Sequence, residues 1–459
     1  MSALAGGRGG SRGALQRSLL VLIAVVAFVL GALLWWLRGP GAMDFAGGRP
    51  VALADYHAAE PTGMPVALRD ADLVARGEYL ARAADCMVCH TTPGGAVYAG
   101  GLAFKLPFGA LYSTNITPDK ETGIGNYSDA QFLAALHRGV RRDGARLYPA
   151  MPFTSYTYMT DADALAIKAY LFSLAPVHAP ARSDALWFPF NQRWLLGIWS
   201  SLFNADHRFQ PNPTRSPEWN RGAYVSEALA HCGECHTPRN LAFALNNRRK
   251  FGGAVTAGWR AYNITSDAKT GIGEWNDDIT ATYLAQGHAA GRGTASGPMG
   301  EAVDESLSQM APEDVRAVVA YLRSVPPVVA PDLPAIRPSP ADASYRSGPA
   351  SADAQGKQVF EGACASCHSW SGVSALSPLA TLTGARAVND PSARNIAQVV
   401  IGGASRTPPD GGISMPAFGS VYSDAEIAAV ANYVSGRFGS RGASLSAQDV
   451  AEFRRQVSQ

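Results

Sequence analysis

RGEYLARAADCMVCHT, residues 76–91, is the stretch that decides the fold, because it ends in the pattern Cys-x-x-Cys-His. The pattern occurs three times, at Cys86, Cys89 and His90, at Cys232, Cys235 and His236, and at Cys364, Cys367 and His368. These copies use all six cysteines of the chain. Two thiols at this spacing can each add to one vinyl group of a haem, and the following histidine can bind the iron. The chain is therefore expected to carry three covalently bound haem c groups.

Two other uses of paired cysteines explain the pattern less well. A thioredoxin-like Cys-x-x-Cys needs no histidine after it, and a structural zinc needs four ligands at each site. A zinc ion held by two of the pairs would leave the three adjacent histidines without a role. The pattern therefore favours haem.

A long internal repeat organises the chain around these motifs. Residues 76–91 match 221–237 with one inserted residue, 115–139 match 263–287, and 160–174 match 311–325. The third unit keeps a leading segment, 356–369, and a closing segment, 423–438. Each unit is predicted to be a helix that leads into the motif, a long loop, and a terminal helix with acidic residues in its first turn. This layout is typical of a small α-helical cytochrome c domain, so we expect a mainly α fold with three tandem cytochrome c-like domains, at residues 68–180, 218–327 and 353–440.

The repeat also selects candidates for the second axial ligand of each iron. The offset between the two Asn-Ile-Thr motifs carries Met151 to Met299, and aligning the terminal helices carries Met151 to within one residue of Met415. Met151 and Met299 are both expected in turn-forming loops before the terminal helix, and Met-Pro recurs at Met151 and Met415. A methionine ligand favours electron transfer at a raised potential. The expected axial pairs are His90–Met151, His236–Met299 and His368–Met415.

Other methionines and histidines fail this comparison. Met159 and Met310 correspond to each other, but the third unit has a tyrosine there, so a hydrophobic staple at the helix entry is expected for both. His137 and His288 are not equivalent in the repeat, and we expect both to be surface or loop histidines.

Two smaller features concern the loops. The asparagines of the Asn-Ile-Thr triplets, Asn115 and Asn263, are expected to build a turn over the haem edge. Arg138, Arg141 and Arg142 could neutralise haem propionates or form a solvated basic face.

The N-terminal region predicts export and membrane attachment. Residues 19–37 are apolar and uncharged, long enough to cross a bilayer as a helix, and arginines in the basic segment 1–18 place the N-terminus in the cytoplasm. A cleaved signal peptide is the competing interpretation. The chain has 39 Lys and Arg and 37 Asp and Glu, so its charge is nearly balanced and gives no indication of nucleic-acid binding.

Four segments lie outside the repeats. They are a Gly/Pro/Ala tether at 38–67, a Trp-rich connector at 181–217, a Pro-rich linker at 328–352 and a C-terminal tail at 441–459. The connector is expected either to pack on the first two domains or to form a docking surface for a partner subunit or the membrane. The linker is expected to be stiff or disordered.

Four stretches of the chain resemble a known protein family: RGEYLARAADCMVCHT, YSTNITPDKETGIGNYS, LYPAMPF and EWNRGAYVSEALAHCGECHTPR. Over residues 68–438 the chain resembles the triple-haem cytochrome c subunit of membrane-bound bacterial dehydrogenases of the alcohol, aldehyde and gluconate type. The resemblance implies an electron-transfer subunit at the bacterial inner membrane, with its haem domains in the periplasm. It implies that a catalytic subunit carrying pyrroloquinoline quinone, FAD or a molybdenum cofactor donates electrons, and that ubiquinone or a terminal oxidase accepts them.

Two other functions fit the motifs. One is the cytochrome c subunit of a haem–copper oxidase. The other is a haem peroxidase with one five-coordinate iron, for which Met299 marks the site. Because six-coordinate His/Met irons leave no position open, no catalytic residue is assigned to the chain itself.

Overall fold

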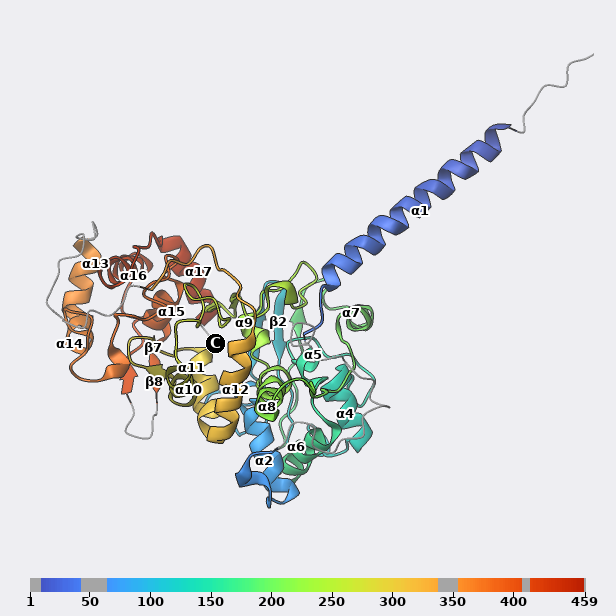
Figure 1. Cartoon of the computed structure of the whole chain (residues 1–459), viewed down its shortest axis with the longest axis horizontal. Helices are drawn as coiled ribbons and strands as arrows, with labels where there is room; N and C mark the ends of the chain where they lie inside the picture. The colour runs from blue at the N-terminus through green and yellow to red at the C-terminus, as the bar shows by residue number, and fades with distance from the viewer. Residues whose placement is uncertain (1–9, 43–63, 337–353, 407–412, 458–459) are drawn as a thin grey trace, which may run out of the picture.

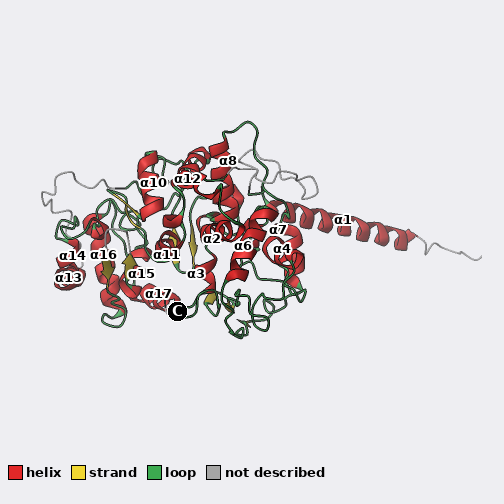
Figure 2. Ribbon diagram, turned by 90° about the horizontal axis from the view of Figure 1, so that it is seen from below, coloured by secondary structure: helices red, strands yellow, loops and turns green. Residues whose placement is uncertain are grey.

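The computed structural model describes residues 10–42, 64–336, 354–406 and 413–457. Short helices joined by long loops form its body, and one long helix, α1, projects away from it (Figures 1 and 2). The prediction of a mainly α chain is confirmed. Parts of five predicted segments lie outside the described residues: the basic N-terminus 1–18, the tether 38–67, the linker 328–352, the third domain 353–440 and the tail 441–459.

The elements follow one another in three sets. The first set comprises α1 (Gly10–Arg38), α2 (Leu73–Ala83), α3 (Cys86–His90), β1 (Ala103–Leu106), β2 (Gly109–Tyr112), α4 (Asp129–Arg138), α5 (Phe153–Tyr156), α6 (Asp161–Ser173), β3 (Ala185–Leu186) and α7 (Leu195–Phe203). The second comprises α8 (Pro217–Tyr224), the π-helical turn η4 (Val225–Leu229), α9 (Gly233–His236), β4 (Ala254–Thr256), β5 (Trp259–Ala261), α10 (Asp277–Gln286), β6 (His288–Ala289), β7 (Gly293–Thr294), α11 (Pro298–Glu305) and α12 (Pro312–Ser324). The third comprises α13 (Ala354–Val359), the π-helical turn η7 (Phe360–Cys364), α14 (Ala365–His368), α15 (Arg394–Gly402), β8 (Ala404–Arg406), β9 (Ile413–Met415), α16 (Asp424–Phe438) and α17 (Ala447–Val457).

The strands are short and antiparallel. β2 pairs with both β1 and β3, while β4–β5, β6–β7 and β8–β9 form separate two-stranded ribbons. The ribbons shape the loops around the motifs, and the helices supply most of the core.

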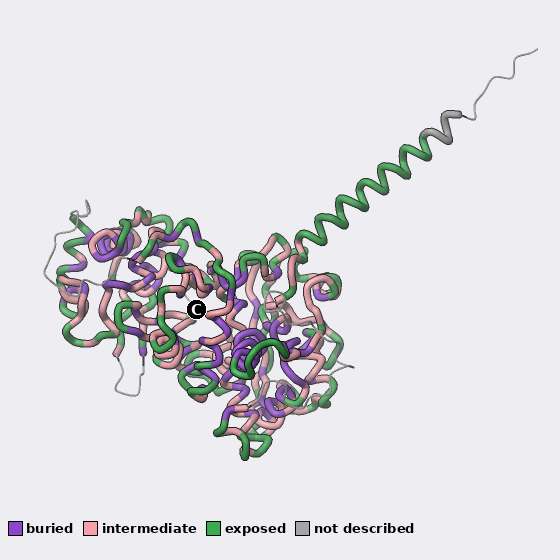
Figure 3. The backbone as a smooth tube through the Cα atoms, viewed as in Figure 1, coloured by how far each residue is buried: buried purple, intermediate pink, exposed green. Residues whose placement is uncertain are grey.

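Helix α1 has the properties of a membrane anchor. Within the described residues it is the one helix long and apolar enough to cross a bilayer, over Leu15–Arg38, with a mean hydropathy of 2.8 in its most apolar window. None of that window is buried against the rest of the chain, and residues 15–36 of the helix are exposed (Figure 3). A helix that is apolar on all sides and unburied by protein is suited to a lipid environment.

Each set contains a close crossing between its leading helix and its terminal helix. The crossings are α2 with α6, α8 with α12 and α13 with α16, and a glycine of the leading helix lies at each. A Cβ on Gly77 would lie 1.9 Å from the Ala166 carbonyl oxygen, and one on Gly222 would lie 1.8 Å from that of Ala317. Gly356 meets its partner helix in the same way, at 2.2 Å. Only glycine permits this approach of two backbones, which explains why it recurs in all three leading segments.

The first two sets are joined by a reciprocal network of buried polar groups. The Tyr224 hydroxyl donates to Asp163 across the interface at 2.6 Å, and the Tyr79 hydroxyl donates to Asp314 in the opposite direction, also at 2.6 Å. Each carboxylate also pairs with an arginine of the leading helix in its own set. The arginine pairs are Arg76–Asp163 and Arg221–Asp314. The first two motifs therefore belong to one interlocked body, in which α2, α6, α8 and α12 lie side by side (Figures 1 and 2).

The buried side chains form two hydrophobic clusters. One is shared by the first and second sets, and the other belongs to the third set. The second cluster includes Val450 and Phe453 of α17, so residues 441–459, expected to be a tail outside the third domain, contribute to its core. The start of the expected linker is packed as well, since Ala330 and Leu333 are buried.

The segment with the inserted residue in the second repeat contains a π-helical turn. Between Arg221 and Cys232 the backbone forms η4, whereas α2 contains no such turn before Cys86. A π-helical turn is a local irregularity within a helix. The third set also forms one, η7, which ends at its first motif cysteine.

Candidate haem sites

Each Cys-x-x-Cys-His motif ends in a short helical turn, formed by α3, α9 and α14. All six thiols are free of disulfide bonds. Burial raises the pKa of Cys86 and of Cys232 to about 12 and that of Cys364 to about 11. Reactive dithiols of the thioredoxin type have lowered pKa values, so these three thiols have the opposite electrostatic character. Cysteine pairs of this kind beside a histidine fit covalent attachment of a haem.

The three motif histidines are held in the same way. Nδ1 of His90 lies 2.6 Å from the Thr114 carbonyl oxygen, and His236 and His368 make the same contact, at 2.6 Å, with the carbonyl oxygens of Tyr262 and Ala380. A carbonyl oxygen can only accept, so Nδ1 carries the hydrogen and Nε2 keeps its lone pair. Burial also lowers the pKa of each imidazole, which keeps it neutral. A neutral imidazole oriented through Nδ1 is the form that ligates a metal through Nε2.

The candidate methionines lie half-buried in three different settings. Met151 follows a turn before α5, Met299 lies in the first turn of α11, and Met415 ends β9. Met151 and Met299 pack against the cluster shared by the first two sets, which Cys86 and Cys232 also contact. Met415 packs against the other cluster, as does the first cysteine of the third motif.

Met299 differs from the expectation that it lies in a loop. It follows Pro298, and proline is favoured at the first position of a helix, whereas in the other two units the proline follows the methionine. The preceding Gly297 has φ +54°, and a Cβ there would clash with the ring of Trp259. These two residues explain why a helix begins here.

The rival residues have other roles. Met159 and Met310 precede the first residues of α6 and α12 by the spacing of a hydrophobic staple, and both are buried in the shared core. His137 is not at the surface as expected, because it is only 1% exposed inside α4. Burial, together with Arg208 and Arg138, lowers its pKa to about 2, so it packs as a neutral ring. His288 is half-buried and contacts the Thr294 hydroxyl.

The Asn-Ile-Thr triplets form matching turns. Oδ1 of Asn115 accepts hydrogen bonds from the backbone N–H and the hydroxyl of Thr117, and its amide donates to Thr122 and to the Val177 carbonyl. Asn263 makes the same four contacts in the second set, with Thr265, Thr270 and Val328. Both asparagines are 3% exposed, so their hydrogen bonds stabilise these turns from inside the protein. In the first set, the turn directly follows the carbonyl of residue 114, which orients His90.

The first and second motifs contact each other and the methionine-bearing segments across the interface. The Tyr156 hydroxyl donates to the Ala84 carbonyl at 2.6 Å, and the Tyr156 ring lies 5.5 Å from the ring of His231. Glu234, inside the second motif, accepts hydrogen bonds from Thr154 and Ser155, just after Met151. The two sites are therefore adjacent.

The third motif lies against the second set. The Thr294 hydroxyl donates to the carbonyl of Leu379, the neighbour of the residue that orients His368. Arg406 of β8 pairs with Asp304 of α11 at 2.9 Å. Since β8 pairs with the strand that carries Met415, and α11 carries Met299, ligand-bearing segments of both sites meet here.

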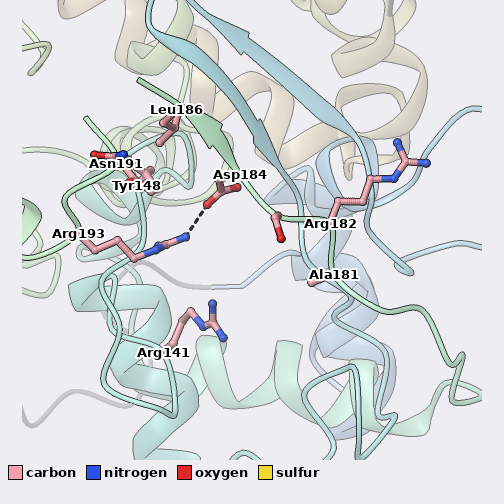
Figure 4. A pocket seen from close by; sticks show the side chains of 9 residues that line it. Arg141, Tyr148, Ala181, Arg182, Asp184, Leu186, Asn191 and Arg193 are labelled. Carbon is pink, nitrogen blue, oxygen red and sulfur yellow. Dashed lines mark hydrogen bonds and ion pairs between the residues drawn. The ribbon is translucent and has the colours of Figure 1, made fainter. Parts of the chain in front are cut away.

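An arginine-lined pocket lies in the first set (Figure 4). Its walls come from the loop before Met151, the end of the β3 strand and the connector. The lining residues are Arg141, Tyr148, Ala181, Arg182, Ser183, Asp184, Leu186, Asn191 and Arg193. Arg193 pairs with Asp184 and Arg141 with Asp143, so the three arginines outnumber the two carboxylates.

The connector arginines of this pocket were missed by the sequence analysis. Among the three arginines proposed there, only Arg141 lines the pocket, while Arg138 is exposed on α4 and Arg142 is exposed in the loop. A connector rich in aromatic residues gave no indication that its arginines line a pocket with Arg141.

Known proteins match this chain at the level of domains and over most of its length. The family model described as Cytochrome c matches residues 74–175, and the one described as Cytochrome C oxidase, cbb3-type, subunit III matches residues 351–434. The fructose dehydrogenase cytochrome subunit of Gluconobacter japonicus is 40% identical over 86% of this chain and 85% of its own length. The gluconate 2-dehydrogenase cytochrome c subunit of Pantoea cypripedii is 37% identical over 83% of this chain and 90% of its own. The cytochrome c subunit of the alcohol dehydrogenase (quinone) of Gluconacetobacter polyoxogenes is 35% identical over 84% of this chain and 85% of its own.

Proposed function

The chain belongs to the family of cytochrome c subunits of membrane-bound dehydrogenases, and from this premise we propose that it carries electrons through three covalent haem c groups. The donor is the catalytic subunit of a periplasmic dehydrogenase, and the acceptor is ubiquinone or a terminal oxidase. The catalytic subunit carries a quinone, flavin or molybdenum cofactor. The chain itself performs no substrate chemistry.

The repeated orientation of the motif histidines carries this proposal. Each of His90, His236 and His368 donates its Nδ1 hydrogen to a backbone carbonyl at 2.6 Å and keeps Nε2 for the iron. The cysteines of each motif form the thioether links. A bound haem supplies a one-electron carrier at each site.

The methionines complete the three sites. We assign Met151 to the first, Met299 to the second and Met415 to the third on the correspondence of the repeats. Met415 packs against the same cluster as Cys364, and the other two methionines pack against the cluster that Cys86 and Cys232 share. With a haem bound, a methionine would supply the second protein ligand and would favour electron transfer at a raised potential over catalysis at iron.

The contacts between the sets support a linear order of sites. Helix α5 of the first set contacts the residue before the second motif through the rings of Tyr156 and His231, and the segments of the third site meet those of the second through Arg406 and Asp304. We therefore place the second haem in the middle of the path. Electrons that pass between the first and third haems cross it.

The arginine-lined pocket is the proposed location of the carboxylates of the first haem. Two of its lining residues, Asp184 and Arg182, contact Tyr112, which lies two residues before Thr114. Tyr148, another lining residue, lies in the loop that leads to Met151. Arg182 is exposed and has no carboxylate partner among the described residues. Arginine is the side chain best suited to pairing with carboxylates.

The domain organisation and the location follow from the same proposal. We assign one cytochrome c domain to each haem, close to residues 68–180, 218–327 and 353–440, with α17 added to the third because it contributes to that core. Helix α1 anchors the chain in the inner membrane, and the haem domains lie in the periplasm.

Purification of the tagged full-length chain from its native membranes tests the proposal. A dehydrogenase catalytic subunit should be isolated with it, and one substrate from a panel of alcohols, aldehydes and sugar acids should reduce the haems. In a Cys232→Ala, Cys235→Ala variant, reduction should stop before the last haem. A complex without any dehydrogenase would contradict the proposal.

A haem–copper oxidase subunit is the second candidate, favoured by the family model that matches residues 351–434. That match covers the third unit alone, whereas the dehydrogenase subunits align over more than four-fifths of the chain. Isolation of the chain with a copper-containing oxidase would decide for this candidate. Carbon monoxide binding to one haem would instead indicate a peroxidase, with the open iron at the second site.

A further inference from the structure

The connector exposes a group of large apolar side chains that the electron-transfer function does not use. The apolar connector surface comprises Trp187, Phe188, Trp194, Ile198 and Leu241, with exposed fractions of 68%, 79%, 65%, 55% and 83%. Single exposed apolar residues are ordinary, but a group of this size marks an interaction site.

This surface rests on a firmly packed base. Phe108 stacks on Phe190 with ring centroids 4.1 Å apart, and Phe243 contacts both rings edge-on at 5.4 and 6.4 Å. The Trp199 indole donates to the Ala242 carbonyl at 2.7 Å, which ties α7 to the loop that carries Leu241. Because the backbone beneath is fixed, the exposed rings cannot turn inward without breaking these contacts.

The same loop holds the end of the membrane helix. The Asn240 amide donates to the Leu37 carbonyl at 2.7 Å, and Arg248 donates to the Trp36 carbonyl at 2.6 Å. Asn240 directly precedes Leu241, and α7 lies beside the base of α1 in both views (Figures 1 and 2). The apolar connector surface is thus continuous with the point where α1 leaves the bilayer.

We propose that the apolar connector surface enters the headgroup layer of the membrane, so that the haem-bearing body lies on the lipid surface instead of hanging from α1. Tryptophan and phenylalanine favour this layer because one face of it is apolar and the other is wet. Arg38, Arg248 and Arg249 are exposed cations near the same place and suit anionic lipid headgroups. The partner is therefore an anionic phospholipid bilayer. The inference goes beyond the proposed function and depends on no property of the haems, so its failure would leave that function intact.

Photo-crosslinking of the full-length chain tests the inference. Phe188→p-benzoylphenylalanine and Trp194→p-benzoylphenylalanine are made separately, and the complex is placed in nanodiscs of phosphatidylethanolamine and phosphatidylglycerol. Leu376→p-benzoylphenylalanine is the matched control, since Leu376 is 71% exposed on the third set, away from α1. The haem absorption spectrum of each variant confirms that it has folded.

After irradiation, phospholipid adducts are expected at Phe188 and Trp194, at least about tenfold above those at Leu376, since only the interfacial layer brings lipid to a protein surface. Equal yields at the three positions would overturn the inference. So would a crosslink from Phe188 or Trp194 to a polypeptide, because it would identify the catalytic subunit as the partner. Two positions are used so that one poorly folded variant still leaves a decisive result.

Discussion

Replacing Tyr224 by phenylalanine should loosen the contact between the first two haem sites. The Tyr224 hydroxyl is buried, donates to Asp163 at 2.6 Å and accepts the Thr160 backbone N–H at 3.1 Å. Loss of a hydrogen bond to a charged group costs about 1.5–3 kcal/mol, and a buried N–H left without a partner costs about 1–3 kcal/mol. Asp163 keeps Arg76, at 2.6 Å, so its charge stays paired. We therefore expect Tyr224→Phe to lower the free energy of unfolding by about 3 kcal/mol.

Hydrogen exchange followed by mass spectrometry is the suitable assay, because it reports local opening free energies. Peptides from α6 and α8 should exchange faster in Tyr224→Phe, while peptides from α16 should not change. Tyr127→Phe is the matched control, since that hydroxyl accepts an exposed hydrogen bond from the Arg142 N–H at 3.3 Å. A change below about 0.5 kcal/mol at α6 and α8 in Tyr224→Phe, the size expected for an ordinary surface substitution, would refute the reasoning.

Three further predictions concern pH, charge and ligation. The backbone N–H and the hydroxyl of Thr122 lower the pKa of Asp119. This carboxylate therefore stabilises the folded state above its unfolded pKa of about 3.9, and the contribution is lost as the pH falls through the folded pKa. Asp119→Asn should make the free energy of unfolding fall less steeply at acidic pH, and an unchanged pH dependence would contradict this. Arg182→Gln should lower the reduction potential of one haem by roughly 50 mV through loss of a nearby positive charge, whereas Arg138→Gln, outside the pocket, should not. Equal shifts for the two variants in a redox titration would exclude the pocket as the location of the haem carboxylates. Met299→Ala should lower the potential of one haem of three and let it bind carbon monoxide, and an unchanged potential would remove Met299 as the ligand.

The sequence predicted the parts of the fold that rest on local pattern. The three motifs and their leading and terminal helices follow from cysteine spacing, apolar periodicity and acidic first turns, all of which can be read within a few turns of chain. The glycines at the crossings were visible in the repeat as Gly77 and Gly222, but their close contact with a distant helix was not. Only the packed structure shows that both are needed for the same approach of two backbones.

Features that depend on contacts between distant segments were missed or misplaced. Helix α17 completes the third core through Val450 and Phe453, yet it follows the last helix of the repeat and has no counterpart in the other units. The burial of His137 depends on packing of α4 in its own unit, and a polar side chain on a helix gives no local sign of that. Arg193 lines the pocket together with Arg141 and Tyr148, although it lies in the connector, more than forty residues after them.

The number of electrons that one chain accepts tests the central claim most directly. Anaerobic reductive titration of the purified full-length chain, followed by haem absorbance against polypeptide concentration, measures it. Three electrons per chain, taken up by low-spin haems that do not bind carbon monoxide, are the predicted result. Uptake of two electrons or fewer, or a high-spin haem that binds carbon monoxide, would contradict the account of three six-coordinate His/Met carriers.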